Sequence, residues 1–189
     1  MDVAEELVVL VDPSDTAIGV APKLAAHRDG LLHRAVSALV FDDSGRVLLQ
    51  RRAAGKYHSA LLWSNTCCGH PRPNESPCDA VRRRLREEMG IASCRLQPAG
   101  RFMYREDLPG PLVEFEVDHV FVGRWSGTPR PDPREVASWR WRTLDELVRD
   151  VATLPHSHTV WLPKLLAHLG DGLGPARPTG VGLGEPLTA

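Results

Sequence analysis

The chain has 189 residues, of which 42% are hydrophobic and 25% are charged, with a formal net charge of -1 and an isoelectric point near 6.7. This length and apolar content suffice for one buried core, so we expect a single globular domain. The near-neutral charge argues against nucleic acid or a membrane as a partner, because both usually require a marked basic excess. Any anionic ligand must therefore be met by a local cluster of cations.

The four cysteines do not suggest a secreted disulfide framework. Cys67 and Cys68 are adjacent, and the segment MDVAEELVVL has no basic region ahead of a long apolar stretch. No apolar run comes near the roughly 20 residues that span a bilayer. We therefore expect a reduced, cytoplasmic protein, present as a monomer or a weak dimer.

The N-terminal third predicts short strands. The apolar run 7–11 ends at the turn-rich cluster Asp-Pro-Ser-Asp at 12–15, which indicates a strand followed by a reversal. Segments 35–41 and 46–50 flank Asp-Asp-Ser-Gly, a sequence typical of a tight hairpin between two strands.

A helix is predicted from Ser76 to Gly90. Ser76 suits the N-cap, Pro77 the first helical position, and Asp79 completes a start that resembles a capping box. Gly90 would end the helix. A turn of about 100° per residue gives three zones on its surface. They are a buried stripe with Val81 and Leu85, a border with Arg84 and Glu88, and a solvent side with Arg83, Arg86 and Glu87.

The segment 113–117 alternates apolar and acidic residues. As a strand it would turn its apolar side chains to a core and place Glu114 and Glu116 together on the opposite face. That face is a candidate site.

The C-terminal part predicts a strand at 138–141, a helix that opens with a capping box at 143–146, and a third helix at 159–169. Together the elements indicate an α+β fold, in which a mixed β-sheet is flanked by helices in one domain over residues 1–169. Residues 170–189 are rich in Gly and Pro, so we expect a disordered tail.

The segment that contains the first predicted helix resembles the Nudix box. It reads Gly69, five residues, Glu75, seven residues, and then Arg-Arg-Leu-Arg-Glu-Glu-Met-Gly at 83–90. The resemblance implies a loop-helix-loop beside a mixed sheet, with glutamates that hold divalent metal on a diphosphate. An amphipathic helix with i,i+4 charge pairs, such as Arg84 with Glu88, explains the same pattern without a site.

The chain departs from the Nudix hydrolases at one position. Those enzymes carry glutamate directly after the box arginine, where this chain has Arg84. A guanidinium in place of a carboxylate changes the charge by two units, which weakens a hydrolytic metal site and favours direct pairing with phosphate oxygens.

Potential metal ligands recur in short patterns. Each histidine alone is more often an ordinary residue than a ligand, but three imidazoles with two carboxylates suit Mn, Fe or Zn. The candidates are His27 and His33 in AAHRDGLLH, His70 in CCGHP, and the strand pair Glu114 and Glu116.

Longer strings are similar to type 1 isopentenyl-diphosphate isomerases from about residue 7 to residue 169. They are RRAAGKYHSALLWSNTCCGHPRP, LLHRA and FMYREDLPGPLVEFEVDHVFVG. The resemblance implies an isomerase that interconverts isopentenyl and dimethylallyl diphosphate by moving protons at carbon, as a step in isoprenoid precursor biosynthesis.

The same resemblance implies a role for each matching residue. Cys68 and Glu116 correspond to the catalytic pair, and Tyr104 supports the glutamate. The implied metal site holds one Mn (or Zn or Fe) ion on His27, His33, His70, Glu114 and Glu116, and Mg joins with the diphosphate at Glu88. The implied contacts to the prenyl diphosphate substrate are Lys23, Arg52, Lys56, Arg84 and Trp161.

Three alternatives remain. A Nudix diphosphate hydrolase would share the fold but would carry a carboxylate where Arg84 stands, and it gives no reason for Cys68 or Glu116. A non-catalytic Nudix-like module would be expected to lose part of the catalytic and metal set. A specialised paralogue acting on another prenyl diphosphate fits the same residues. Which of Cys68 and Glu116 protonates first is left open.

Overall fold

The structure, a computed structural model, describes residues 6–170. Within these residues the strands form one mixed sheet. The strands are β1 (Leu7–Val11), β2 (Ala17–Pro22), β3 (His33–Phe41), β4 (Val47–Arg52), β5 (Trp63–Ser64), β6 (Cys67–Gly69), β7 (Arg95–Asp107), β8 (Val113–Arg124) and β9 (Val136–Arg142). The helices are α1 (Lys23–Asp29), α2 (Pro77–Met89), α3 (Leu144–Thr153) and α4 (Trp161–Gly170), with a 3-10 turn η1 (Pro155–Ser157) between the last two. The predicted α+β class is confirmed.

Strand β3 lies at the centre of the sheet. It runs parallel to β8, from the pair His33 and Glu116 to the pair Phe41 and Arg124, and pairs antiparallel with β6 and β4. Residues 35–41 of the strand are apolar apart from Ser37, because both faces of the strand are covered there. Alternate side chains therefore enter two different cores.

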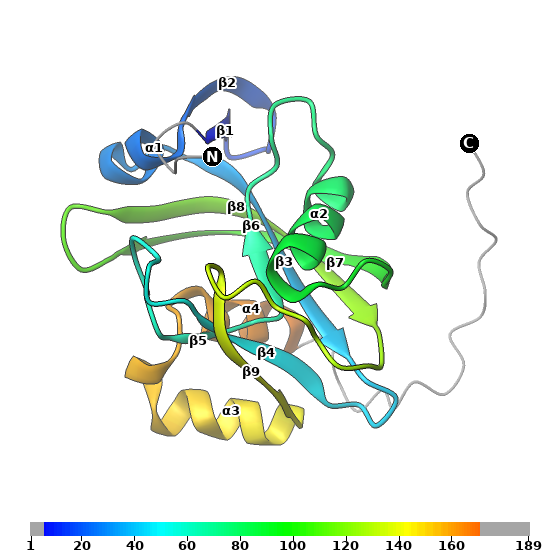
Figure 1. The fold of residues 1–189 in the computed structure, drawn as a ribbon. Helices are drawn as coiled ribbons and strands as arrows, with labels where there is room; N and C mark the ends of the chain where they lie inside the picture. Colours follow the sequence, from blue (N-terminus) through cyan, green and yellow to red (C-terminus); the bar gives the residue numbers. More distant parts are fainter. Residues whose placement is uncertain (1–5, 171–189) are drawn as a thin grey trace, which may run out of the picture.

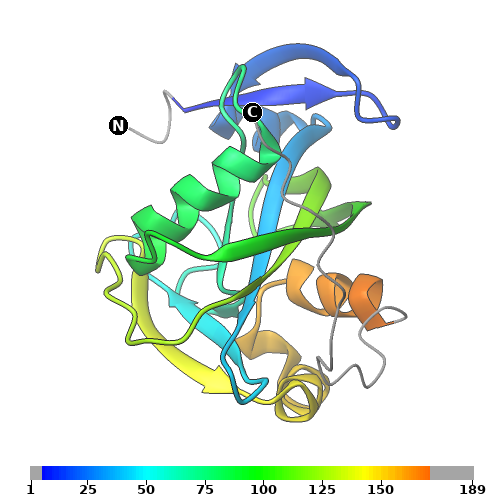
Figure 2. The same cartoon turned by 90° about the vertical axis from the view of Figure 1, so that its right-hand side faces the viewer.

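The first core lies between the sheet and α2. It joins Val36, Ala38 and Val40 of β3 to Val81 and Leu85 of α2. The second core lies on the other face of the sheet, where α3 and α4 pack. Figure 2 shows α2 and α4 on opposite sides of the sheet. The β1–β2 hairpin and α1 lie at the end of the sheet near the N-terminus (Figure 1).

The predicted start and end of α2 are confirmed. The Ser76 hydroxyl accepts a hydrogen bond from the Asp79 amide at 3.1 Å, and Gly90 closes the helix in the left-handed region with φ 68°. The predicted capping box between Thr143 and Glu146 at the start of α3 is also present. These caps set the ends of two helices on opposite faces of the sheet.

Some elements differ from the predictions. Helix α1 was not predicted because its seven residues are too few for a helical period, and its N-cap residue Pro22 makes no side-chain cap. Strand β8 extends to Arg124, well beyond the predicted 113–117, because it pairs with β7 on one side and β3 on the other. From residue 171 onward, the predicted tail lies outside the described residues. No helix among residues 6–170 is long and apolar enough to cross a bilayer.

Candidate active site

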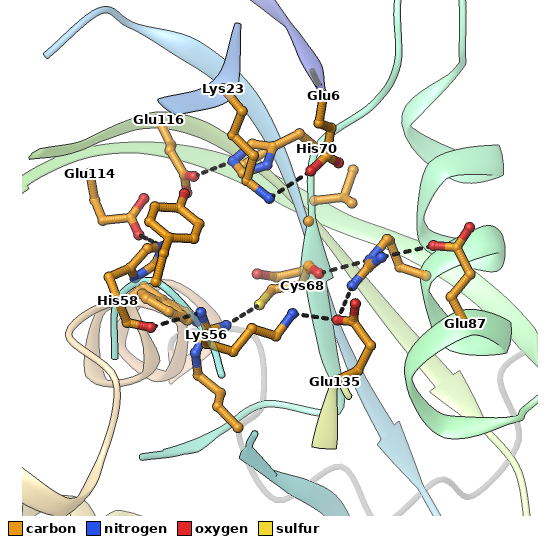
Figure 3. A pocket seen from close by; sticks show the side chains of 18 of the residues that line it. Glu6, Lys23, Lys56, His58, Cys68, His70, Glu87, Glu114, Glu116 and Glu135 are labelled. Carbon is orange, nitrogen blue, oxygen red and sulfur yellow. Dashed lines mark hydrogen bonds and ion pairs between the residues drawn. The ribbon is translucent and has the colours of Figure 1, made fainter. Parts of the chain in front are cut away.

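A cavity of about 540 Å³ opens beside the N-terminal end of β3. Its walls come from strands β3, β4, β6, β7 and β8 and from helices α1, α2 and α4. The residue before β1, the loop after β4 and the loop before β9 complete them. Figure 3 shows Cys68 near the middle, with Glu114 and Glu116 towards one end and Glu87 and Glu135 towards the other. The cavity thus has a histidine-carboxylate end and a cationic end.

Four predicted metal ligands converge at or behind the first end, where His70 and Glu116 line the cavity and His27 and His33 lie buried beside them. His27 from α1, His33 from β3, His70 after β6 and Glu116 from β8 are buried, and one ligand atom of each lies within 4.8 Å of the others. His33 and Glu116 are far apart in sequence and meet because they are register partners in the parallel pair β3 and β8.

The histidine rings are set to present free nitrogens. Nδ1 of His27 lies 2.8 Å from the Lys23 carbonyl, and Nδ1 of His33 lies 2.8 Å from the Leu31 carbonyl. Carbonyl oxygens only accept, so each Nδ1 carries the hydrogen and each Nε2 is left with a lone pair in the neutral ring. Both Nε2 atoms are buried without a hydrogen-bond partner. This is the tautomer that a metal-ligating histidine requires.

The carboxylates stand at the spacing of metal ligands. Glu116 Oε1 lies 2.9 Å from His70 Nε2 and 3.4 Å from His33 Nε2, and Glu114 Oε2 lies 3.3 Å from His27 Nε2. Neighbouring donors on an ion with bonds of about 2.1 Å are about 3 Å apart. A cation among these atoms would also remove the repulsion between nitrogen lone pairs and carboxylate oxygens. The donor set therefore fits a divalent ion.

Glu114 sits slightly apart from the other predicted ligands. Its ligand atom groups with those of His27 and His58 rather than with those of His33, His70 and Glu116. His58 Nε2 lies 3.4 Å from the second oxygen of Glu114. Sequence reasoning gives His58 no role, since its partner Glu114 is distant in the chain.

The two carboxylates differ in their protonation. Burial raises the pKa of Glu114, and the nearby Glu116 raises it further. Burial disfavours the ionised form of Glu116 as well, but hydrogen bonds from His33 and His70, in the state in which their Nε2 atoms carry hydrogen, outweigh burial and hold the pKa of Glu116 well below its usual range. Glu116 is thus the stronger candidate for a base.

Tyr104 contacts the same carboxylate. Its hydroxyl donates a hydrogen bond of 2.6 Å to Glu116 Oε2, and the two residues are partners across β7 and β8. Burial raises the pKa of Tyr104, so the hydroxyl keeps its proton and remains a donor.

The adjacent cysteines point to opposite sides of β6. Cys67 is fully buried in the core under α2, with its sulfur 3.9 Å from the Val81 carbonyl. Cys68 lines the cavity, where Arg52 Nη1 lies 3.8 Å from its sulfur. Desolvation raises the pKa of Cys68 to about 12, so its side chain is a thiol at neutral pH.

The four predicted diphosphate cations, Lys23, Arg52, Lys56 and Arg84, all line the cavity. Three of them meet carboxylates. Lys23 pairs with Glu6 at 2.9 Å, Lys56 pairs with Glu135, and Arg84 pairs with Glu87 and Glu135 at 2.8 Å each. Glu6 and Glu135 were not identified from sequence, since neither lies in a motif.

Arg52 and Trp161 form another part of the wall. Arg52 donates to the carbonyls of Ser59 and His58 at 3.1 Å each, and its guanidinium carbon lies 5.3 Å from the centre of the Trp161 ring. The Trp161 indole donates to Asn65 Oδ1 at 3.0 Å, which fixes the ring at the start of α4. Trp161 thus lines the cavity, and its contact with the substrate remains a prediction.

Three positions on α2 differ from the simple helical picture. Glu87, which was expected to face solvent, lines the cavity and pairs with Arg84. Arg83 was expected to face solvent, and this is wrong: it lines the cavity and donates to Glu75 at 2.7 Å and to the His70 carbonyl at 3.0 Å. The reason is that the loop before α2 folds back over that side of the helix. Glu88, the predicted Mg ligand, is 2% exposed and accepts hydrogen bonds from Arg84 and Gln50. It is not among the residues that line the cavity.

Comparison with known proteins gives consistent results. The model of the NUDIX domain family matches residues 31–169. "Isopentenyl-diphosphate Delta-isomerase 2" of Aromatoleum aromaticum is 53% identical over 162 residues, covering 86% of this chain and 85% of the relative. "Isopentenyl-diphosphate Delta-isomerase" of Burkholderia multivorans is 52% identical over 166 residues, covering 88% and 94%.

Solved structures share the fold. DR0079 from Deinococcus radiodurans superimposes with a TM-score of 0.72 at 21% identity, covering 86% of this chain and 98% of that one. A MutT NUDIX hydrolase from Burkholderia pseudomallei superimposes with a TM-score of 0.58 at 26% identity, covering 73% and 98%. These structures are similar to this chain in fold, whereas the curated relatives are similar over most of the sequence.

Proposed function

Since the chain belongs to the isopentenyl-diphosphate Delta-isomerase family of Nudix-domain proteins, we propose that its cavity is the site where isopentenyl and dimethylallyl diphosphate are interconverted. The protein is an isomerase that moves a carbon-carbon double bond. The observation that carries the assignment of the site is one juxtaposition. A thiol and a carboxylate, Cys68 and Glu116, face the same cavity as four cations.

The reaction requires one acid and one base. A proton must be added at one carbon of a weakly basic alkene and another removed at a second carbon, through a tertiary carbocation or a state close to it. Cys68 keeps its proton and Glu116 is ionised, so the pair supplies one group that can donate a proton and one that can accept a proton. Tyr104 orients the Glu116 carboxylate through its 2.6 Å hydrogen bond.

The surroundings of the pair suit a cationic intermediate. The Trp161 indole lines the cavity, and an aromatic face beside a desolvated cation contributes on the order of 2 kcal/mol. The same ring is 4% exposed, so it helps to keep water from the reacting carbons. Arg52, Lys56, Arg84 and Lys23 would bind the diphosphate and so place the C5 chain against the thiol and the carboxylate.

The metal proposal is one divalent ion, Mn or alternatively Zn or Fe, held by His27, His33, His70, Glu114 and Glu116, with Mg joining at Glu88 when diphosphate binds. The ion at the histidine end would fix the position and tune the acidity of Glu116. Because Glu88 accepts from Arg84 and Gln50, it would have to exchange one of these partners for Mg. Elemental analysis of the purified protein should find about one tightly bound ion per chain; full activity in strong chelator together with no bound metal would contradict this proposal.

The decisive experiment is incubation of the purified protein with isopentenyl diphosphate in deuterated water. Dimethylallyl diphosphate should form, and deuterium should appear at carbon in substrate or product. Release of phosphate without any change in the double bond would refute the assignment.

The domain organisation, oligomeric state and cellular location belong to the same proposal. We propose a single catalytic domain over residues 1–169, present as a monomer or weak dimer in the cytoplasm. The family match over 31–169 supports the domain, and the buried Val8, Val9 and Val11 of β1 extend it towards the N-terminus. Light scattering on the purified protein tests the oligomeric state.

A further inference from the structure

The loop between β4 and β5 joins the two ends of the cavity. Its consecutive residues Lys56, Tyr57 and His58 all line the wall. Lys56 pairs with Glu135 at the cationic end, whereas His58 faces Glu114 at the histidine-carboxylate end (Figure 3). None of the metal roles described above involves His58.

His58 and His27 lie beside opposite oxygens of the Glu114 carboxylate. Glu114 Oε2 lies 3.3 Å from His27 Nε2, and Glu114 Oε1 lies 3.4 Å from His58 Nε2. The ligand atoms of His27, His58 and Glu114 lie within 4.8 Å of one another, but His58 does not join the group of His33, His70 and Glu116. Among the predicted ligands of the ion, His58 lies beside Glu114 and His27 and not beside His33, His70 or Glu116, so its direct effect is on the position of the Glu114 carboxylate.

The His58 ring is held in one orientation. Its Nδ1 lies 3.2 Å from the Ser59 hydroxyl, which can donate to it and so leave the ring hydrogen on Nε2, facing Glu114. The ring also meets the edges or faces of Tyr57 and Trp161, with centroids 4.4 and 6.1 Å away, and the side chain is 8% exposed. A buried, oriented donor facing one carboxylate oxygen leaves the other oxygen free for a ligand role.

We propose that His58 is a positioning residue of the metal site, whose Nε2–H fixes Glu114 so that Oε2 stands beside His27. The inference rests on the proposed ligand role of Glu114 and His27. Hydrogen-bonding partners of ligating groups usually contribute roughly 10- to 100-fold in metal affinity, because they remove the freedom of the ligand to turn away. Loss of His58 should therefore weaken metal binding without removing any ligand.

Two substitutions of His58 distinguish a role as hydrogen-bond donor to Glu114 from a role in packing alone. Glutamine places its amide nitrogen near the position of His Nε2, so His58→Gln retains a donor towards Glu114. Asparagine is also polar, but its amide nitrogen reaches only to the position of His Nδ1, so His58→Asn has no donor that reaches Glu114. The exposed His156 in η1 supplies a matched control for loss of an imidazole elsewhere, as His156→Ala.

The readout is the dissociation constant for Mn²⁺, measured on metal-free protein by competition with a chelator, together with the melting temperature of the same samples. We expect His58→Asn to bind Mn²⁺ roughly 10- to 100-fold more weakly than wild type. His58→Gln should stay within a few fold of wild type, and His156→Ala should be unchanged. With saturating Mn²⁺, His58→Asn should recover a larger share of its turnover than it shows at limiting metal.

Two results would overturn the inference. Unchanged Mn²⁺ affinity in His58→Asn would show that Glu114 needs no such partner, and equal losses in His58→Asn and His58→Gln would show that the donor is not what matters. If wild type binds Mn²⁺ and the variants behave as expected while isopentenyl diphosphate is not isomerised, the proposed reaction fails but the role of His58 stands.

Discussion

At the scale of single residues, the adjacent cysteines of β6 lie in different surroundings and have different roles. Successive side chains of a strand point to opposite faces, so Cys67 enters the core under α2 and Cys68 enters the cavity. The chemistry of the two thiols therefore differs although their sequence neighbourhoods are nearly the same.

The first prediction concerns this pair. Cys68→Ala should lower kcat by roughly 10²- to 10⁴-fold, the usual contribution of a general acid or base, because it removes one member of the proton-transfer pair. Diphosphate affinity should survive, since Arg52, Lys56 and Arg84 remain. Steady-state kinetics with isopentenyl diphosphate and binding of pyrophosphate measure the two quantities.

Cys67→Ala is the control for the cysteine prediction. It should keep turnover close to wild type and lose at most about 1–2 kcal/mol of stability from the core. The opposite pattern, an active Cys68→Ala with an inactive Cys67→Ala, would show that the assignment of the motif is displaced by one residue.

The second prediction concerns the ion pair of Glu6 with Lys23. Burial disfavours the Glu6 carboxylate, but Lys23 at 2.9 Å outweighs it and lowers the pKa of Glu6 from 4.5 to about 2. Because the pKa of Glu6 is lower in the folded than in the unfolded protein, its ionised carboxylate stabilises the fold fully at pH values above about 5. This stabilisation is lost as the pH falls from about 5 towards 2. At pH 6 the free energy of unfolding of the wild type should exceed that of Glu6→Gln by about 2 kcal/mol, a figure that allows for solvent screening of the pair.

Urea denaturation of the metal-free proteins at several pH values checks this second prediction. The difference in unfolding free energy between wild type and Glu6→Gln should shrink steadily below pH 5. A difference that stays constant down to pH 3 would mean that the carboxylate charge does not contribute.

At the scale of elements, Glu135 ties three segments together. It stands before β9 and accepts hydrogen bonds from Lys56 in the loop after β4 and from Arg84 on α2. These are two of the cations proposed to bind the diphosphate, so the carboxylate occupies donors that the substrate would use. The cationic end is thus held in place by a group that competes with its ligand.

The third prediction follows from this competition. Glu135→Gln should bind inorganic pyrophosphate in the presence of Mg roughly 3- to 10-fold more tightly, equal to about 1 kcal/mol, because a competing negative charge is removed. Isothermal titration measures the affinity.

Asp150→Asn provides a matched control for the Glu135 variant. Asp150 pairs with Arg140 and Arg142 outside the cavity, and its side chain is 26% exposed, as is that of Glu135. Its pyrophosphate affinity should not change. Weaker binding in Glu135→Gln would instead indicate that Glu135 supports the ligand.

Among the helices and strands, those with local sequence signals could be predicted from the sequence. Helix α2 was predicted with both ends because Ser76 and Gly90 are local signals, and the β3–β4 hairpin follows from the turn between two apolar runs. The seven residues of α1 and the three of β6 carry no periodicity long enough to identify them. Short elements depend on tertiary packing, which is not encoded in a local pattern.

The site was predictable where a motif or a family resemblance names the residue. Cys68, Glu116 and His70 were identified in this way and line one cavity, whereas His27 and His33 lie buried beside Glu116. His58 and Glu135 were missed because their partners are distant in sequence. The parallel register that joins His33 to Glu116 is likewise a property of the folded sheet and has no signal in either segment.

At the scale of the whole molecule, the fold does not decide the chemistry. A MutT NUDIX hydrolase shares the architecture with a TM-score of 0.58, so the same sheet and helix can support a different reaction. The difference expected from the sequence is the guanidinium of Arg84 on α2, at the position where the resemblance to the Nudix box implies a carboxylate in the hydrolases.

The last prediction is that nucleoside diphosphates are not hydrolysed. Arg84 pairs with Glu87, Glu88 and Glu135 at 2.7–2.8 Å, so these carboxylates are already neutralised in part and attract fewer metal ions than a free acidic cluster would. A hydrolytic Nudix site needs metals to activate water and to stabilise the leaving phosphate, and here one of the expected ligands is replaced by a positive charge. Phosphate release from ADP with Mg should therefore stay at background in a preparation that isomerises isopentenyl diphosphate. Rapid Mg-dependent release of phosphate, with no movement of the double bond, would show instead that the guanidinium does not block hydrolysis and that the chain has kept the chemistry of its structural relatives.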